Sequence, residues 1–384
     1  MTPPVSFAAE NDGGLSEHVI DTVSPSHVTF NLFDYWANEK GSSYNNGWGI
    51  QKGINVGHIL LFNGNQSYAV GPWNSWTGKP GHDINGDDKP GVAYGEYRGI
   101  VKNTLSGGYP TLDLQDESYS PPFMTGSGQK EESLAYLFDT NAYTPYRTVY
   151  ENVQGLVKYN GEGGYVYNSH ENYAAFQEAT SGTVGTNGEA SDGYFDVYDS
   201  WALTSGGSPS GQFFPPPFDG AGEVFKKTNG AYEVDDEGLL VPKTDVKLAG
   251  NTTLNHYFGM TMETLFLQPE DGKIDADTPM SFSFSGDDDV WIFIDDVLVS
   301  DLGGIHDECF TVIDFESGMV YTGLTPTIRN SDGSFTEDIP TLEELKTGTP
   351  EQGGGGPGII DQASSLPREI MRTLQPPTAS NPNL

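Results

Sequence analysis

Apolar residues along the chain occur in short runs separated by polar, glycine-rich segments. An alternating run at residues 27–35 predicts the first strand of the fold, and runs at 57–62 and 155–159 predict further short strands. Alanine and leucine without glycine favour short helices at 133–138 and 173–176. The pattern therefore predicts an all-β chain with long loop insertions and a few short helices.

The most informative pattern lies at residues 281–301. Residues 281–285 alternate between serine and phenylalanine, which predicts a half-buried strand, and residues 290–294 are apolar throughout, which predicts a strand covered on both faces. Three successive aspartates, residues 287–289, stand between these strands. We call them the aspartate triplet.

A second pair of aspartates, at residues 295–296, separates two apolar runs and predicts a two-residue turn. With that turn, Ile294 pairs with Val297 and, in a regular ladder, Val290 pairs with Asp301. The predicted hairpin therefore returns Asp301 to the aspartate triplet.

Side-chain parity places Asp288 on the face of Val290, and hence on the face predicted for Asp301. Two carboxylates about 6 Å apart repel by roughly 3 kcal/mol at an effective dielectric constant near 20. A calcium ion held by carboxylates, carbonyls and water would neutralise this charge. The alternative is a solvated loop with splayed side chains. We expect a Ca²⁺ site with the ligands Asp287, Asp288, Asp289 and Asp301.

The charge of the chain removes two classes of partner. The 384 residues include 18 Lys and Arg against 54 Asp and Glu, which gives a formal net charge of −36. A nucleic-acid binder, or a protein held on anionic lipid, needs a basic surface, so neither role is expected. No apolar stretch approaches the roughly 20 residues of a membrane span, so no direct membrane insertion is expected. Cys309 is the only cysteine, which excludes an internal disulfide.

Several segments together resemble the fibro-slime domain, a relative of the protective-antigen-type lectin domains of bacterial surface proteins and yeast adhesins. They include LNHYFGMTMET at 254–264, FSGDDDVWIFID at 284–295 and DLGGIH at 301–306. The resemblance implies a jelly-roll-type β-sandwich with its fibro-slime core at about 251–310. It also implies that Asp287 and Asp288 bind calcium, and that the ion coordinates sugar hydroxyls directly.

The expected organisation has three parts. Residues 1–25 predict a leader or linker, residues 26–340 a single adhesin-like β-sandwich domain, and residues 341–384 a flexible C-terminal tail. Within this tail, residues 341–345 are typical of one helical turn with Thr341 as its N-cap. Few basic residues and much Asp, Asn, Gly and Tyr suit a secreted bacterial cell-surface protein that works where calcium is plentiful. A looser resemblance of the residues that precede the fibro-slime core to Gram-positive surface adhesins implies a Gram-positive bacterium.

Four further residues are candidates for ligand binding. His306 and Asp307 follow two glycines; the histidine suits a metal ligand, a sugar contact or a catalytic base, and equally a structural role. Trp73 and Trp76 lie between Gly/Pro positions and suit a sugar platform, although aromatic residues are more often core.

Three functions compete. The first is a calcium-dependent carbohydrate-binding module of an adhesin, whose partner is a host or microbial glycan or a surface glycoprotein. The second is a structural stalk or pilus module in which calcium only stabilises the fold. The third, a glycoside hydrolase, needs two separated carboxylates, which contiguous aspartates do not provide. We expect no enzymatic activity.

Overall fold

The computed structural model describes the following residues: 13–34, 81–82, 88–89, 101–111, 113, 133–141, 148–161, 163–178, 193–200, 204–205, 208–209, 213, 224–243, 258–286, 290–303, 308–325, 327–329, 335–337, 339–347 and 362–365. The chain divides into two compact units. Unit 1 comprises residues 1–47, 137–265 and 331–335, and unit 2 comprises residues 48–136, 266–330 and 336–384. The predicted domain at 26–340 covers parts of both.

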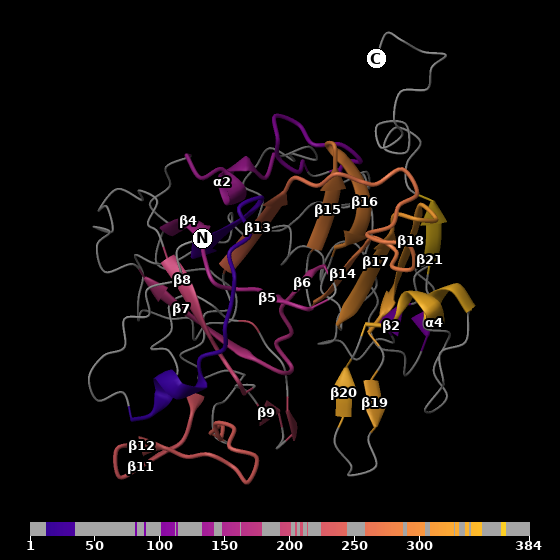
Figure 1. The fold of residues 1–384 in the computed structure, drawn as a ribbon. Coiled ribbons are helices and arrows are strands. Elements are labelled where there is room, and N and C mark those ends of the chain that lie inside the picture. Colours follow the sequence, from indigo (N-terminus) through magenta and orange to yellow (C-terminus); the bar gives the residue numbers. More distant parts are fainter. Residues whose placement is uncertain are drawn as a thin grey trace, which may run out of the picture. The chain divides into compact units, whose positions relative to one another are not determined.

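Strands dominate the described residues, and they pair antiparallel in small sheets, so the prediction of an all-β chain is confirmed (Figure 1). The jelly-roll sandwich stays a prediction. Helices are short: the described ones are η1 (Leu15–His18), α2 (Ala135–Phe138) and α4 (Leu342–Thr347). None of the helices in the described part of the chain is long and apolar enough to cross a membrane.

Unit 1 contains a three-stranded sheet of order β13-β1-β4 and four two-stranded hairpins. The sheet strands are β1 (Val28–Asp34), β4 (Thr148–Val153) and β13 (Phe258–Thr264). The hairpins are β5 (Lys158–Tyr159) with β6 (Tyr165–Val166), β7 (Tyr173–Glu178) with β8 (Gly193–Tyr198), β9 (Thr204–Ser205) with β10 (Ser208–Pro209), and β11 (Lys227–Thr228) with β12 (Ala231–Tyr232).

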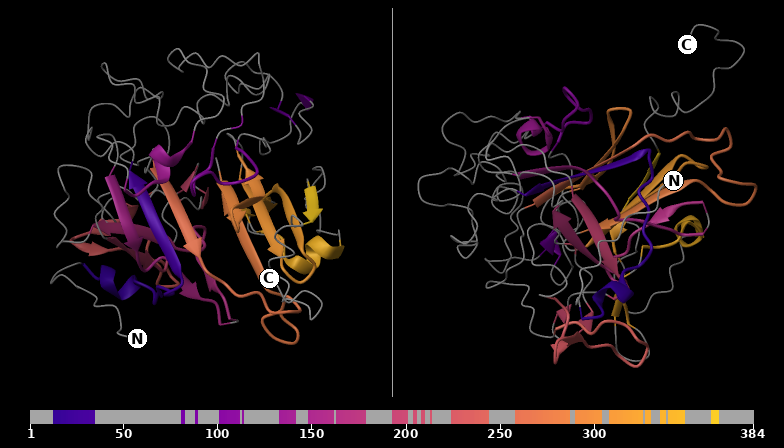
Figure 2. Two further views of the ribbon diagram at one scale, coloured as in Figure 1. Left: turned by 90° about the horizontal axis from the view of Figure 1, so that it is seen from above. Right: turned by 60° about the vertical axis from the view of Figure 1, so that its left-hand side comes forward.

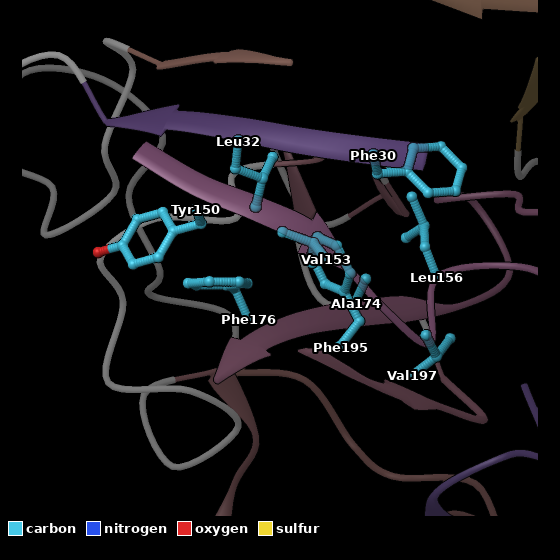
Figure 3. Packing of buried hydrophobic residues seen from close by; sticks show 9 residues of the cluster. All are labelled: Phe30, Leu32, Tyr150, Val153, Leu156, Ala174, Phe176, Phe195 and Val197. Atoms are coloured by element: carbon cyan, nitrogen blue, oxygen red, sulfur yellow. The ribbon is translucent and has the colours of Figure 1, made fainter. Parts of the chain in front are cut away.

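The core of unit 1 lies between the sheet and the β7–β8 hairpin. Side chains of β1 and β4 pack there against side chains of β7 and β8 (Figure 3). The strand predicted at 27–35 is confirmed as β1, because its alternation places one set of apolar residues on this core. The buried cluster comprises Phe30, Leu32, Tyr150, Val153, Leu156, Ala174, Phe176, Phe195 and Val197.

The helix predicted at 173–176 is wrong, because these residues belong to strand β7. Tyr173 and Ala175 pack into one buried cluster, and Ala174 and Phe176 pack into another. A strand that is buried on both faces has no polar face, so its sequence does not alternate and resembles a buried helix. The other predicted helix, at 133–138, is confirmed by α2.

Unit 2 contains a four-stranded sheet of order β14-β17-β18-β21 and a separate β15–β16 hairpin. These strands are β14 (Ser281–Gly286), β15 (Val290–Ile294), β16 (Val297–Leu302), β17 (Cys309–Asp314), β18 (Met319–Leu324) and β21 (Gln362–Ser365). The shorter strands of unit 2 are β2 (Gly81–His82), β3 (Asp88–Lys89) and β19 (Thr327–Arg329). Strand β20 (Phe335–Glu337) pairs with β19. The boundary between the two units crosses β20 and also α2.

Strand β17 is buried on both faces and organises unit 2. Ile313 packs with residues of the β15–β16 hairpin, including Val299. Phe310 and Val312 point to the other face and pack against Leu345 of α4. Figure 2 shows α4 beside the sheet. The hairpin and the helix therefore cover opposite faces of the sheet.

Two elements fall within the predicted C-terminal tail. Helix α4 begins with a capping box: the Thr341 hydroxyl accepts the Glu344 N–H at 3.3 Å, and the Glu344 carboxylate accepts the Thr341 N–H at 2.7 Å. The predicted helical turn with Thr341 as N-cap is thus confirmed. Farther on, β21 pairs with β18 at the edge of the sheet.

Gly272 has a backbone that other residues adopt poorly. Its φ is +68°, and a Cβ atom there would meet the Phe315 carbonyl oxygen and lie 2.5 Å from the Glu316 Cα. We expect Gly272→Ala to lower the free energy of unfolding by about 2 kcal/mol, because left-handed strain adds to a clash with backbone. Gly238→Ala is the control: φ is +83° with open space around the position, so only about 1 kcal/mol is expected. If urea unfolding shows the same loss of stability for Gly272→Ala and Gly238→Ala, the clash at Gly272 does not contribute.

Candidate metal-binding edge of unit 2

The predicted turn at residues 295–296 is confirmed. Asp295 and Asp296 have φ angles of +48° and +65°, as a type I′ turn requires, and Ile294 pairs with Val297. Aspartate tolerates this left-handed backbone better than most residues. The β15–β16 hairpin therefore closes where the sequence predicts.

The predicted register beyond the turn is wrong by one residue. A bulge lets Phe293 pair with Leu298 and Ile292 with Ser300, so Val299 is left over. Farther along the ladder, Asp301 therefore lies opposite Trp291 rather than opposite Val290.

This shift moves Asp301 to the other face of the hairpin. Directly paired residues share a face, so Asp301 shares the face of Trp291. The prediction that Asp301 and Asp288 share a face assumed a regular ladder. Because the bulge shifts the pairing by one residue, that prediction no longer holds. An apolar run such as 297–299 contains no polar residue that would mark a bulge, which explains the error.

The Asp301 carboxylate is held by two donors. The Trp291 indole Nε1–H donates to Asp301 Oδ1 at 3.0 Å, and the Gly303 backbone N–H donates to the same oxygen at 3.1 Å. Both contacts are partly buried. Hydrogen bonds of this kind orient a carboxylate and are typical of outer-shell support for a metal ligand.

A second carboxylate, which the sequence analysis missed, lies just before β17. The Ser285 hydroxyl at the end of β14 donates to the Glu308 carboxylate and lies 3.1 Å from the Thr325 hydroxyl oxygen. The Thr325 N–H donates to the Glu308 carbonyl at 2.8 Å. Only its position in the sequence could have pointed to this carboxylate, because Glu308 directly precedes the first residue of the buried strand β17.

Strand pairing fixes where the two connections between sheet and hairpin begin and end. Gly286 at the end of β14 pairs with Cys309 at the start of β17, and Val290 at the start of β15 pairs with Leu302 at the end of β16. The aspartate triplet connects one member of each pair, and the chain leading into Glu308 connects the other two. Both connections are therefore bounded by two described pairs of strand ends, Gly286–Cys309 and Val290–Leu302, which together we call the calcium edge of unit 2.

Most predicted site residues lie outside the described residues: Asp287, Asp288, Asp289, His306, Asp307, Trp73 and Trp76. Their roles stay predictions. Across the described ranges, no three His, Cys, Asp or Glu side chains form a group that could hold a metal ion. Asp301 and Glu308 are thus the described carboxylates that a calcium ion at this edge could use.

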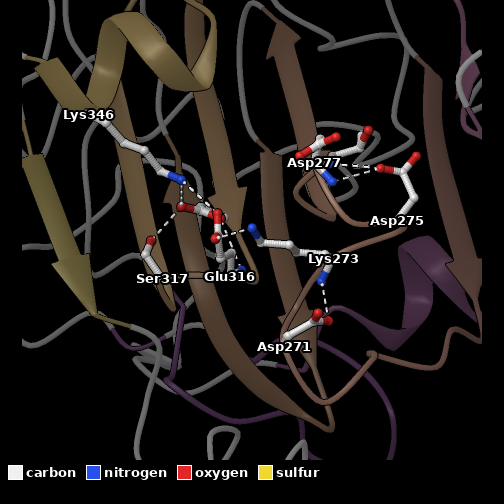
Figure 4. A network of polar contacts seen from close by, with 9 residues as sticks. Asp271, Lys273, Asp275, Asp277, Glu316, Ser317 and Lys346 are labelled. Carbon is white, nitrogen blue, oxygen red and sulfur yellow. Dashed lines mark hydrogen bonds and ion pairs between the residues drawn. The ribbon is translucent and has the colours of Figure 1, made fainter.

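A separate polar network holds α4 to the sheet (Figure 4). Asp314 has no exposed surface, and its carboxylate forms an ion pair with Lys346 Nζ at 2.8 Å. The same carboxylate accepts hydrogen bonds from the Ser317 hydroxyl at 2.5 Å and from the Glu316 N–H at 3.0 Å. Lys346 also lies 3.3 Å from the Glu316 carboxylate, which Lys273 approaches at 3.1 Å. This network joins oppositely charged residues and is structural.

These contacts shift the pKa values of the network in opposite directions. Burial raises the pKa of Asp314, but the donors Lys346, Ser317 and Glu316 N–H outweigh burial and hold the pKa below its ordinary value. Hydrogen bonds from Lys273 and Lys346 lower the pKa of Glu316, and the Asp314 carboxylate raises the pKa of Lys346. The charged forms are therefore the stable forms in the folded chain.

Comparison with known proteins finds short matches to proteins of one organism. The chain is 38% identical over 101 residues to psiB, 51% identical over 109 residues to psiR, and 27% identical over 156 residues to psiP, all of Dictyostelium discoideum. All three relatives carry psi names. The matches cover 26%, 27% and 40% of this chain but only 16%, 10% and 19% of the relatives, so the chain spans less than a fifth of each.

These comparisons overturn the resemblance stated from the sequence. No protein-family profile matches the chain, and no solved structure matches it. The predicted fibro-slime and lectin-type kinship is wrong, because the similar proteins are Dictyostelium psi proteins rather than bacterial or yeast adhesins. The resemblance was carried by short segments between residues 254 and 306, which were too short to fix a family.

Proposed function

We propose that the chain is an extracellular, calcium-dependent carbohydrate-binding module without enzymatic activity. The Gram-positive origin was implied by the overturned resemblance, so it is not carried over. The ion would be held by the aspartate triplet at the edge of unit 2, with Asp301 or Glu308 beside it. Its partner would be a glycan or a surface glycoprotein.

The paired strand ends are the observation that supports this proposal most. Gly286 and Val290, which flank the aspartate triplet in the sequence, pair with Cys309 and Leu302, the sequence neighbours of Glu308 and Asp301. The Asp301 carboxylate is oriented by Trp291 and Gly303. Carboxylates gathered at one edge repel unless a cation neutralises them, and calcium accepts irregular oxygen geometry. A calcium ion with open coordination positions can take sugar hydroxyls as further oxygen ligands.

The structural module is the rival proposal, because a bound calcium ion can stabilise a fold without contacting a ligand. Both proposals predict that calcium raises the melting temperature. Only the carbohydrate-binding module predicts a sugar whose binding needs the ion.

The test combines a glycan array with thermal melting, each in calcium and in EDTA. We expect at least one glycan to bind in calcium, to be lost in EDTA and to return when calcium is restored, together with a melting temperature that falls on chelation. A fall in melting temperature with no glycan bound in either buffer would support the structural module. Release of reducing sugar would show that the chain is a hydrolase and contradict the proposal.

A further inference from the structure

The β5–β6 hairpin of unit 1, labelled in Figure 1, carries aromatic side chains on an exposed face. Tyr159 lies directly opposite Tyr165, and their ring centroids are 6.1 Å apart with an interplanar angle of 65°. The His27 ring extends this arrangement, with its centroid 6.0 Å from that of Tyr165. Tyr159 is 56% exposed and Tyr165 is 45% exposed. We call these three residues the tyrosine row.

Hydrogen bonds fix the backbone beneath the tyrosine row. The Gly163 N–H donates to the Tyr159 hydroxyl at 3.0 Å, so this ring is tied to its own hairpin loop. The loop is closed by the Asn160 N–H on the Gly164 carbonyl at 3.0 Å and by the Gly164 N–H on the Asn160 side chain at 2.9 Å. A surface that is ordered before binding loses little conformational entropy when a ligand arrives.

The charged residue of these two strands lies on the other face. Lys158 precedes Tyr159, so its side chain points away from the tyrosine row, and it contacts Glu171 at 3.4 Å and Asn172 at 3.2 Å. Tyr159 and Tyr165 offer ring faces for C–H groups and hydroxyls for hydrogen bonds. The chain as a whole has a net charge of −36, which repels anionic ligands.

Exposed aromatic rings with polar tips, on a face to which β5 and β6 contribute no charged side chain, match a neutral sugar, which presents both C–H faces and hydroxyls. We propose that the tyrosine row binds a neutral saccharide by ring stacking, without a metal ion. The tyrosine row includes no residue of the calcium edge, so this second surface goes beyond the proposed function. Dependence on calcium distinguishes the two.

The test is native electrophoresis of the full chain through gels that contain a neutral polysaccharide: hydroxyethylcellulose, galactomannan or xyloglucan, with EDTA throughout. We expect at least one polysaccharide to retard the wild-type chain in EDTA. Tyr159→Ala and Tyr165→Ala should each weaken this binding about tenfold, whereas Tyr165→Phe, which keeps the ring, should weaken it less than threefold. Tyr194→Ala is the matched control, because Tyr194 is 39% exposed on β8 of the same unit.

Three results would overturn the proposal, provided that circular dichroism shows each variant folded. Failure of every polysaccharide to retard the wild-type chain in EDTA would overturn it, even if calcium restored retardation, since that binding belongs to the calcium edge. Equal weakening by Tyr194→Ala would show a general effect of losing a surface ring. A dimer that Tyr159→Ala converts to a monomer would show that the tyrosine row is an interface between copies.

Discussion

Asp288→Asn is expected to remove the stabilisation that calcium gives to the chain. An ion that binds only the folded state stabilises it by about 2.7 kcal/mol when its free concentration is 100 times the dissociation constant. The wild-type chain should gain this amount when calcium replaces EDTA, and the variant should gain almost nothing. Urea unfolding in the two buffers measures both gains.

The same variant should behave differently in EDTA. Without the ion, neighbouring carboxylates repel, so loss of one charge should leave the variant at least as stable as the wild-type chain. Asp236→Asn is the matched control, because Asp236 is an exposed acid of unit 1. It should keep the whole calcium gain. If Asp288→Asn is less stable than the wild-type chain in EDTA and still gains the full stabilisation from calcium, the ion does not bind at the aspartate triplet.

Lys346→Met is expected to lower the free energy of unfolding by about 3 kcal/mol at neutral pH, because it leaves the buried Asp314 carboxylate without its cation. Methionine keeps the apolar stem and favours helix, so the loss reports the charge. Lys273→Met is the control. It removes only the partly exposed pair with Glu316, so a loss below about 1 kcal/mol is expected.

The pH dependence of this loss follows from the lowered pKa of Asp314. A carboxyl group whose pKa is lower in the folded state stabilises the fold above its unfolded pKa, and this contribution disappears as the pH falls through the folded pKa. The difference between wild type and Lys346→Met should therefore be full at neutral pH and shrink below about pH 4. The pKa of Lys346 is shifted in the opposite direction, because the Asp314 carboxylate raises it. Its contribution to stability is therefore lost in strong base, as the pH rises through the raised pKa. A difference that is constant from pH 7 to pH 3 would contradict the account.

Local patterns predicted several elements because their physical causes are local. The alternation at 27–35 corresponds to β1, and Thr341 caps α4 as expected. The two aspartates of the turn at 295–296 adopt the left-handed backbone that the turn needs. In each case the local sequence agrees with the fold that the distant contacts also favour.

The errors arise where distant contacts decide. Residues 173–176 form a strand because two separate clusters bury their opposite faces. The pairing of Asp314 with Lys346 depends on α4 packing onto β17, which no local pattern shows. Asp301 was assigned to the correct hairpin but to the wrong face, because one unpaired residue, Val299, shifts the ladder.

The most direct test of the central claim is anomalous scattering from crystals grown in excess calcium. The account predicts a calcium peak between Gly286 and Val290, with oxygen ligands at 2.3–2.6 Å that include carboxylates of the aspartate triplet. Data from crystals soaked in EDTA should lack this peak. Water alone at that position in a calcium-grown crystal would contradict the calcium site and, with it, the proposed calcium-dependent binding of carbohydrate.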